Sequence, residues 1–120
     1  MTIEVLDGAF SVCKAADFSG VDLNSGVCFL ARTDEENSLV CETRRVPTNV
    51  TAREDGWRAF RIAGVLDFSL IGILAKIASL LAEQGISIFA VSTYNTDYVL
   101  TKEMDRALDA LTAAGYEIRR

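Results

Sequence analysis

Two hydrophobic periodicities alternate along the C-terminal half of the chain, and they restrict the fold more than any other feature of the sequence. Residues 57–65 alternate apolar and polar side chains, with Phe60 and Ile62 on one face, which predicts a strand. Ser69 can cap a following helix, and Gly85 supplies the left-handed residue that commonly ends one. We therefore expect a strand and then an amphipathic helix. The apolar side chains of this helix recur at helical spacing, and they are Leu70, Ile73, Leu74, Ile77 and Leu81.

The rest of this half continues the alternation. A continuously apolar, β-branched run predicts a strand that is covered on both faces, and a polar stretch separates it from the next strand. The order β-α-β-β-α-β is that of an α+β, ferredoxin-like fold, an antiparallel sheet with its helices on one face. The predicted elements after the first helix are a strand at residues 86–91, a strand at 98–101, a helix from Met104 until Gly115 and a short strand at 116–118.

The N-terminal half gives a weaker pattern. Residues 9–13, 27–31 and 39–43 predict strands. Thr33 and Glu36 have the spacing of a capping box, but only a single helical turn fits there. Residues 46–56 contain the only Pro and a charged run, which is typical of a connection between two packed units. We therefore predict two subdomains, an abbreviated relative of the second unit at residues 1–50 and the complete unit at 57–120.

Two polar clusters interrupt the apolar C-terminal half, one after its first predicted strand and one before its third. In a split βαβ sheet these two strands are neighbours and run antiparallel, so the end of one lies beside the start of the other. We therefore expect both clusters at one edge of the sheet, next to the start of the first helix. The candidate ligand-binding residues are Asp67, Phe68, Ser69, Leu70, Gly72, Ile73, Ser92, Thr93, Tyr94, Asn95, Thr96 and Asp97.

The residue types in these clusters suit an α-amino acid. Unpaired N–H groups at the start of the helix, around residues 69–72, carry partial positive charge and suit a carboxylate. Asp67 and Asp97 offer the opposite charge to an ammonium group. Gly72 costs about 1 kcal/mol relative to Ala inside a helix, and it would let a ligand or a neighbouring backbone approach closely. The sequence therefore predicts a small-ligand site at this edge.

A simpler interpretation of the same clusters is structural. Asp67 and Ser69 would then only cap the helix, and residues 92–97 would only form a hairpin turn. Two details argue against it, because the turn lacks an Asn-Gly or Asp-Gly pair and contains Tyr94, which a plain turn does not need.

Charge and composition argue against several classes of partner. A formal net charge of -5 disfavours nucleic acid and anionic membrane surfaces, which bind through clustered Lys and Arg, and favours a cationic or zwitterionic ligand. Cys13, Cys28 and Cys41 lie far apart in apolar runs, which indicates reduced core thiols rather than a metal site or catalysis. No cofactor is predicted. Residues 1–10 lack a secretory signal and no apolar stretch is long enough to span a bilayer, so we expect a soluble, cytoplasmic protein.

The sequence around both clusters resembles the ACT-domain family. Residues 64–75 and 85–100 carry the resemblance, and the Ser-Thr-Tyr-x-Thr-Asp-Tyr string that begins at Ser92 is its most specific part. Within the family, the chain is similar to small bacterial ACT proteins related to the CASTOR arginine sensors and to aspartokinase regulatory domains. Residues 32–40 and 56–58 look like first-half signatures of that subgroup, so the resemblance covers nearly the whole chain.

ACT domains are regulatory modules that bind amino acids at interfaces between paired domains. The resemblance therefore implies that residues 67–73 hold the ligand backbone and that residues 93–97 close the site or recognise the ligand side chain. It also aligns Asp97 with the acid that faces the ligand guanidinium in the arginine sensors. We expect no attached enzyme domain, so a regulated partner would be a separate protein.

Three functions follow from these observations. The first is a non-catalytic amino-acid sensor, which we expect to be a homodimer because pairing would cover strand edges and a helix-free sheet face. The second is a ligand-free interaction or assembly module that uses the same edge. The third is an enzyme with Asp67 and Asp97 as an acid–base pair. The sequence disfavours this third hypothesis because no nucleophile–base pair, metal cluster or phosphate-binding loop accompanies the two acids.

Overall fold

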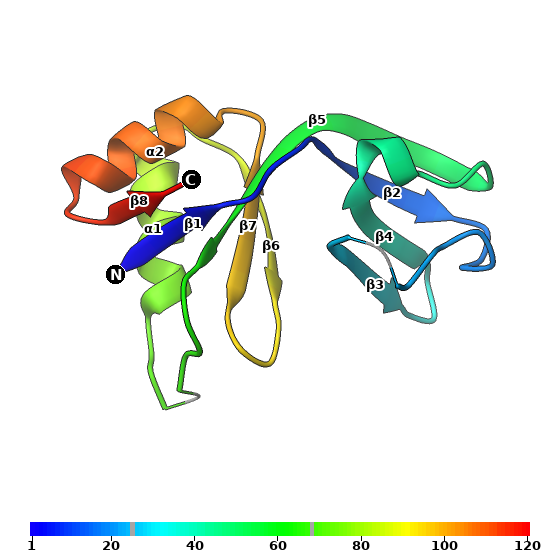
Figure 1. Ribbon diagram of the computed structural model, residues 1–120, viewed down its shortest axis with the longest axis horizontal. Helices are drawn as coiled ribbons and strands as arrows, with labels where there is room; N and C mark the ends of the chain where they lie inside the picture. Colours follow the sequence, from blue (N-terminus) through cyan, green and yellow to red (C-terminus); the bar gives the residue numbers. More distant parts are fainter. Residues whose placement is uncertain (25, 68) are drawn as a thin grey trace. The chain divides into compact units, whose positions relative to one another are not determined.

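The structure, a computed structural model, describes residues 1–24, 26–67 and 69–120. Within these residues the chain forms strands, two α-helices and one short 3-10 helix (Figure 1). Their bounds are β1 Thr2–Val5, β2 Phe10–Ala15, β3 Cys28–Arg32, β4 Asn37–Glu42, the 3-10 helix Thr43–Arg45, β5 Val50–Ile62, α1 Ile73–Glu83, β6 Ile88–Ser92, β7 Asp97–Thr101, α2 Met104–Ala113 and β8 Glu117–Arg119.

The chain divides into two units at different residues from those predicted. The α/β unit contains Met1–Asp7 and Arg58–Arg120, and the β unit contains Gly8–Trp57. The expected connection at residues 46–56 is largely strand, because β5 begins at Val50 and its first part pairs with β2. This part of β5 is polar and exposed, which gives it the composition of a linker. Backbone pairing, which composition does not reveal, makes it a strand.

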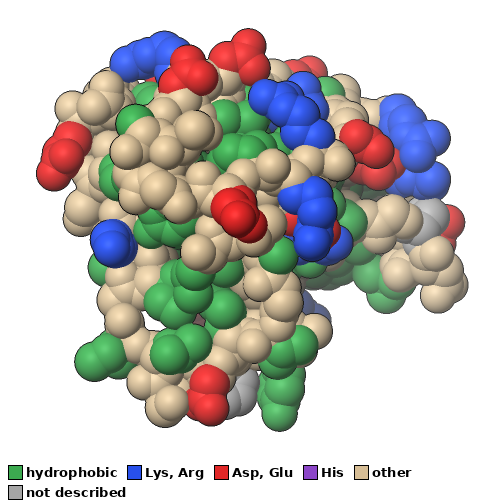
Figure 2. Space-filling view, turned by 60° about the vertical axis from the view of Figure 1, so that its left-hand side comes forward, with side chains coloured by type: hydrophobic (Ala, Val, Ile, Leu, Met, Phe, Trp, Pro, Cys, Tyr) green, Lys and Arg blue, Asp and Glu red, His purple; other side chains and the backbone are tan. Residues whose placement is uncertain are grey.

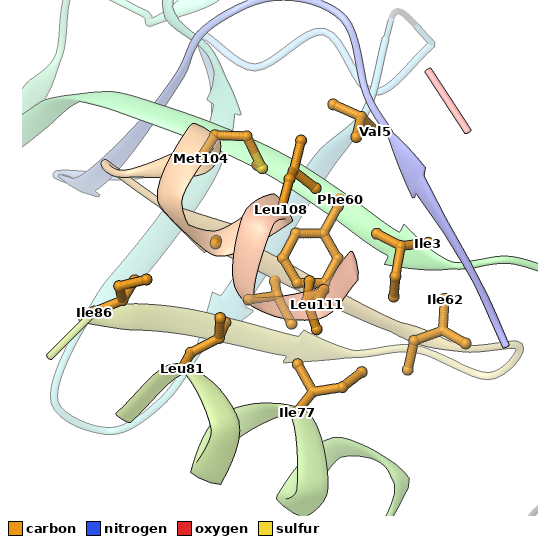
Figure 3. Close-up of a cluster of buried hydrophobic side chains, with 12 residues drawn as sticks. Ile3, Val5, Phe60, Ile62, Ile77, Leu81, Ile86, Met104, Leu108 and Leu111 are labelled. Atoms are coloured by element: carbon orange, nitrogen blue, oxygen red, sulfur yellow. The ribbon is translucent and has the colours of Figure 1, made fainter. Parts of the chain in front are cut away.

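The α/β unit has the predicted element order from β5 to β8. Its sheet has the order β6-β7-β5-β1-β8. The first and third predicted strands, β5 and β7, are antiparallel neighbours as expected, with Phe60 opposite Val99. Both helices pack on one face of this sheet (Figure 3). The α+β, ferredoxin-like fold is therefore confirmed, with one additional strand.

The additional strand, β1, corrects two predictions. The N-terminal residues belong to the α/β unit, and they separate β5 from β8: Ile3 lies opposite both Ile62 and Ile118. Because β1 runs parallel to β8, the sheet is mixed rather than wholly antiparallel. Glu4 fixes β1 to both neighbours, since its carboxylate accepts a hydrogen bond of 2.6 Å from Arg61 Nε and another of 3.0 Å from Arg119 Nε.

The core of the α/β unit lies between the sheet and the two helices. Figure 3 shows side chains from β1 and β5 pointing toward those of α1 and α2. Phe60 is fully buried in the middle of this cluster. The helical periodicity therefore identified the correct buried face. The labelled members are Ile3, Val5, Phe60, Ile62, Ile77, Leu81, Ile86, Met104, Leu108 and Leu111.

The apolar run after α1 does not form the fully covered strand that we expected. It contributes β6, whose only strand partner in the described sheet is β7, and whose residues are half-buried or exposed. Ile86 is buried, but it lies before the strand. The run is apolar because Ile86 belongs to the core and Ile88 packs against it, although β6 lies at the edge of the sheet. In the described parts of the chain, no helix has the length and apolar character needed to cross a membrane.

The β unit is a small sheet with the order β3-β4-β2-β5. One buried cluster on it contains Cys13, Leu39 and Cys41. The helical turn expected at residues 33–37 is absent, and a hairpin turn joins β3 to β4 there. Thr33 shapes this turn, because its hydroxyl accepts hydrogen bonds of 3.1 Å from the backbone N–H groups of Glu35 and Glu36. The spacing that we took for a capping box therefore indicates a turn. A threonine hydroxyl can accept hydrogen bonds from the N–H groups two and three residues later in a hairpin turn as well as at the start of a helix.

Candidate functional site

The loop that leaves β5 is shaped by Asp67. Its Oδ1 accepts a hydrogen bond of 2.8 Å from the backbone N–H of Ser69, and its carbonyl accepts one of 3.0 Å from the N–H of Leu70. These bonds close a local turn before the helix. The hydrogen bonds from Ser69, first from its backbone N–H and then from its side chain, stabilise the ionised carboxylate and hold the pKa of Asp67 below its ordinary value.

Helix α1 begins three residues later than the apolar spacing predicted. Leu70 is half-exposed, and Gly72 occupies the N-cap position with a φ of 79°, a left-handed conformation that favours glycine. Ser69 therefore does not cap the helix, and Gly72 is not a helix-interior glycine. The N–H groups without an intrahelical acceptor are consequently those of Ile73 and the two residues after it.

The second polar cluster forms the tight turn between β6 and β7. The backbone N–H of Thr93 donates to the carbonyl of Thr96 over 2.8 Å, and the Thr93 hydroxyl donates to the same carbonyl over 2.9 Å. On the flanking strands, Ser92 Oγ donates a hydrogen bond of 2.6 Å to Asp97 Oδ1. The turn thus fixes the Asp97 carboxylate, while Tyr94 is exposed at its tip.

Two hydrogen bonds join this turn to the end of β5. The N–H of Leu66 donates to the carbonyl of Asn95 over 2.7 Å. The buried hydroxyl of Thr96 donates to the carbonyl of Ile62 over 2.7 Å. Figure 1 shows the loop after β5 and the β6–β7 turn at the same end of the α/β unit. The expected convergence of the two polar clusters is therefore confirmed as geometry.

A pocket of about 320 Å³ lies between the two loops and the start of α1. Ten of the twelve candidate residues line it; Ser69 does not, and Phe68 lies outside the described residues. Leu66, Leu74 and Ala75 also line the pocket although the sequence reasoning missed them. Leu74 and Ala75 could have been found by taking Gly72 as the N-cap, because both residues then lie in the first turn of the helix. The lining residues are Leu66, Asp67, Leu70, Gly72, Ile73, Leu74, Ala75, Ser92, Thr93, Tyr94, Asn95, Thr96 and Asp97.

The pocket combines groups of opposite electrostatic character. The first residues of α1, Ile73 to Ala75, bring the partial positive charge of a helix N-terminus to one part of its lining. Asp67 and Asp97 bring carboxylates to the other part. The rest of the wall is mixed: the polar β6–β7 turn lines one part, and Leu66 and Leu70 line another. Such an arrangement can hold a small molecule that carries both a carboxylate and a cation.

Thr96 provides a test of how the site is held together. We expect Thr96→Val to lower the free energy of unfolding by about 1–3 kcal/mol, because it leaves the buried Ile62 carbonyl without its hydroxyl donor. Urea unfolding monitored by circular dichroism measures this loss. Thr96→Ser is the matched control because it keeps the hydroxyl, and an equal loss in both variants would assign the effect to packing instead.

The fold and the pocket define a ferredoxin-like α+β domain with a ligand-sized site beside its first helix. The family model for the ACT domain matches residues 52–113, and the chain belongs to this family. The match includes α1, β7 and all the residues that line the pocket. The chain is thus a regulatory module of the ACT type.

Solved structures support the assignment of the fold. The chain is similar to protein Atu0741 from Agobacterium tumefaciens, with 29% identity, a TM-score of 0.84, and coverage of 98% of this chain and 90% of that one. It also matches a structure of aspartokinase alpha and beta subunits at 18% identity and a TM-score of 0.62, covering 95% and 97% of the two chains. Aspartate kinase from Clostridium acetobutylicum, described as an allosteric enzyme, matches at 15% identity with a TM-score of 0.63, over 93% of this chain and 33% of the enzyme. No curated protein sequence matches the chain.

Proposed function

We propose that this ACT module is a non-catalytic sensor that binds an amino acid in the pocket between the β5–α1 loop and the β6–β7 turn. The observation that carries the proposal is the meeting of a helix N-terminus and two carboxylates in one pocket of about 320 Å³. This volume is at the lower end of the range of about 300–1,000 Å³ typical of small-molecule sites. It therefore suits a metabolite of amino-acid size.

In this proposal each part of the ligand has its own partner in the pocket. The ligand carboxylate accepts hydrogen bonds from the N–H groups at Ile73–Ala75, where the helix dipole favours negative charge. The Asp97 carboxylate, held by Ser92, pairs with the ligand's ammonium group or with a basic side chain. Asp67 lies at the same pocket and adds negative charge.

Regulation would follow from unequal binding to two states. A ligand shifts an equilibrium only by its difference in affinity for the states concerned. We propose that these states are two pairings of the module in a cytoplasmic homodimer, and that a separate protein responds to the change. The pocket is lined by both the β5–α1 loop and the β6–β7 turn. This supports the proposed coupling between ligand and pairing, because a partner chain can contact both loops at once.

The structure also bears on the enzymatic alternative. A general acid at neutral pH needs a carboxyl group whose pKa is raised toward 7. The pKa of Asp67 is shifted in the opposite direction by its hydrogen bonds to Ser69, which makes it a poor acid for this purpose. This shift therefore counts against Asp67 as the acid of an acid–base pair.

Calorimetric titration with each standard amino acid tests the proposal. We expect one chemical class, basic or neutral, to give saturable heat with one site per chain, because acidic side chains would meet Asp67 and Asp97. A tenfold preference corresponds to about 1.4 kcal/mol. Uniform absence of heat at several temperatures, from a protein whose circular dichroism shows it to be folded, would contradict the proposal.

An assembly module is the second candidate, and exposed apolar side chains favour it. Ile71 is 92% exposed and Tyr94 is 79% exposed, and both lie on the loops that frame the pocket. Figure 2 shows hydrophobic side chains gathered at the lower end of the view, where these two loops lie. Exposed large apolar side chains that gather at one end of a domain are found at interaction sites. The two candidates differ in whether a small ligand binds.

A further inference from the structure

The cysteines of the β unit are brought together by the pairing of its strands. Cys28 on β3 lies directly opposite Cys41 on β4. Cys13 on β2 lies opposite Leu39, two residues from Cys41 on the same strand. Residues that are opposite, or two positions apart, point to the same face of a sheet. The three free thiols therefore share one face of the β unit.

The register distinguishes between the possible disulfides. Directly opposite residues of an antiparallel pair have Cα atoms about 4.5–5.5 Å apart, which lies within the range of about 4.4–6.8 Å seen in disulfides. Cys28 and Cys41 meet this requirement. Cys13 and Cys41 are diagonal neighbours, and a diagonal separation of about 7–8 Å exceeds the range. Only the first pair can therefore join without movement of the backbone.

A cavity gives a small oxidant access to this pair. Cys28 and Cys41 both line a cavity of about 220 Å³, together with the guanidinium-bearing residues Arg44 and Arg45. Cys28 is half-buried on the edge strand β3, whereas Cys41 is buried on β4. The sulfur of Cys28 is therefore the one that meets a molecule entering from solvent.

We propose that Cys28 and Cys41 are a modification site that hydrogen peroxide or a related hydroperoxide converts to an intramolecular disulfide. In the first step the Cys28 sulfur attacks one peroxide oxygen, an S–O bond forms, the O–O bond breaks, and the departing hydroxide takes the thiol proton as water. In the second step the Cys41 sulfur attacks the Cys28 sulfenic acid. The S–S bond forms, the S–O bond breaks, and the second hydroxide leaves as water with the Cys41 proton.

This sequence of steps balances. Two thiols lose two electrons and two protons, and one peroxide is reduced to two molecules of water. Burial, with smaller contributions from Cys13 and Cys28, raises the pKa of Cys41 to about 11, so Cys41 is a neutral thiol and gives up its proton in the second step, when its sulfur attacks. The product would fasten the edge strand β3 to β4 across the hairpin that joins them.

Trypsin separates the three cysteines, which makes the bond directly readable. Cys13, Cys28 and Cys41 fall in the peptides at residues 1–14, 15–32 and 33–44. The folded protein is treated with hydrogen peroxide, quenched, alkylated in denaturant and digested without reduction. We expect the second and third peptides to appear as one linked species, taken from protein that runs as a single chain on a non-reducing denaturing gel, and dithiothreitol to separate them again.

Variants add a second measurement. In Cys13→Ser, peroxide treatment should still remove two thiols from alkylation. In Cys28→Ser, no intramolecular disulfide should form. A link that includes the peptide of Cys13, links found only between chains, sulfinic acid without a disulfide, or three unreacted thiols would each overturn the proposal. Because the linked peptide is read in the unmodified sequence, the test stands even if a variant fails to fold.

Discussion

Phe60→Ala is expected to lower the free energy of unfolding of the α/β unit by about 3–5 kcal/mol. Phe60 is 0% exposed and lies on β5 between Val5 and Val99. Its ring packs between the sheet and helix α2, as Figure 3 shows. Truncation removes the ring from a core to which both helices contribute, and the surrounding backbone is too constrained by strand pairing to fill the space. Urea unfolding monitored by far-ultraviolet circular dichroism measures the loss.

This loss is large relative to the total stability of a domain, which is about 5–15 kcal/mol. Ile71→Ala is a matched control because it also removes an apolar side chain from the α/β unit, but one that is 92% exposed. We expect it to change the free energy of unfolding by no more than about 0.5 kcal/mol. Similar effects of the two substitutions would mean that Phe60 does not lie in the core described here.

Periodicity predicted the core elements because burial itself determines their pattern. The helices and the strands β5 and β7 each present one apolar face to the same cluster, so their spacing is visible in the sequence. Strand β1 escaped prediction because it has four residues, and because its pairing with β5 and β8 depends on partners more than fifty positions away. A short strand of this kind forms because it pairs with distant strands, and its own residues carry little periodicity.

The site could be predicted in outline but not in detail. Topology alone placed the β5–α1 loop beside the β6–β7 turn, because antiparallel neighbours bring their connecting segments together. The start of α1 was misplaced because Leu70 continues the apolar spacing, whereas the left-handed backbone at Gly72 sets the true N-cap. The bond from Thr96 to Ile62 depends on a side-chain conformation that no spacing encodes.

Asp97→Ala is expected to weaken binding of the best amino-acid ligand at least tenfold, while any self-association survives. A hydrogen bond to a charged group contributes about 1.5–3 kcal/mol, and about 1.4 kcal/mol is a factor of ten in affinity. Asp97 lines the pocket with its carboxylate fixed by Ser92 Oγ at 2.6 Å, so little reorganisation is needed before it pairs with a cation. Calorimetry with the preferred amino acid measures the change, and light scattering measures the mass of the protein in solution.

Asp97→Asn and Ser92→Ala separate charge from position. Asp97→Asn keeps the size and one acceptor oxygen but removes the charge, so it should approach the loss seen with Asp97→Ala if a cation is recognised. Ser92→Ala keeps the charge and removes only the hydroxyl that orients the carboxylate, so its effect should be smaller than either. Unchanged affinity in all three variants would indicate that the ligand's cation does not bind at Asp97, and Asp67 would be the next residue to test. Loss of self-association together with binding would instead indicate that Asp97 supports the assembly, because the exposed apolar loops next to it would then have lost their arrangement.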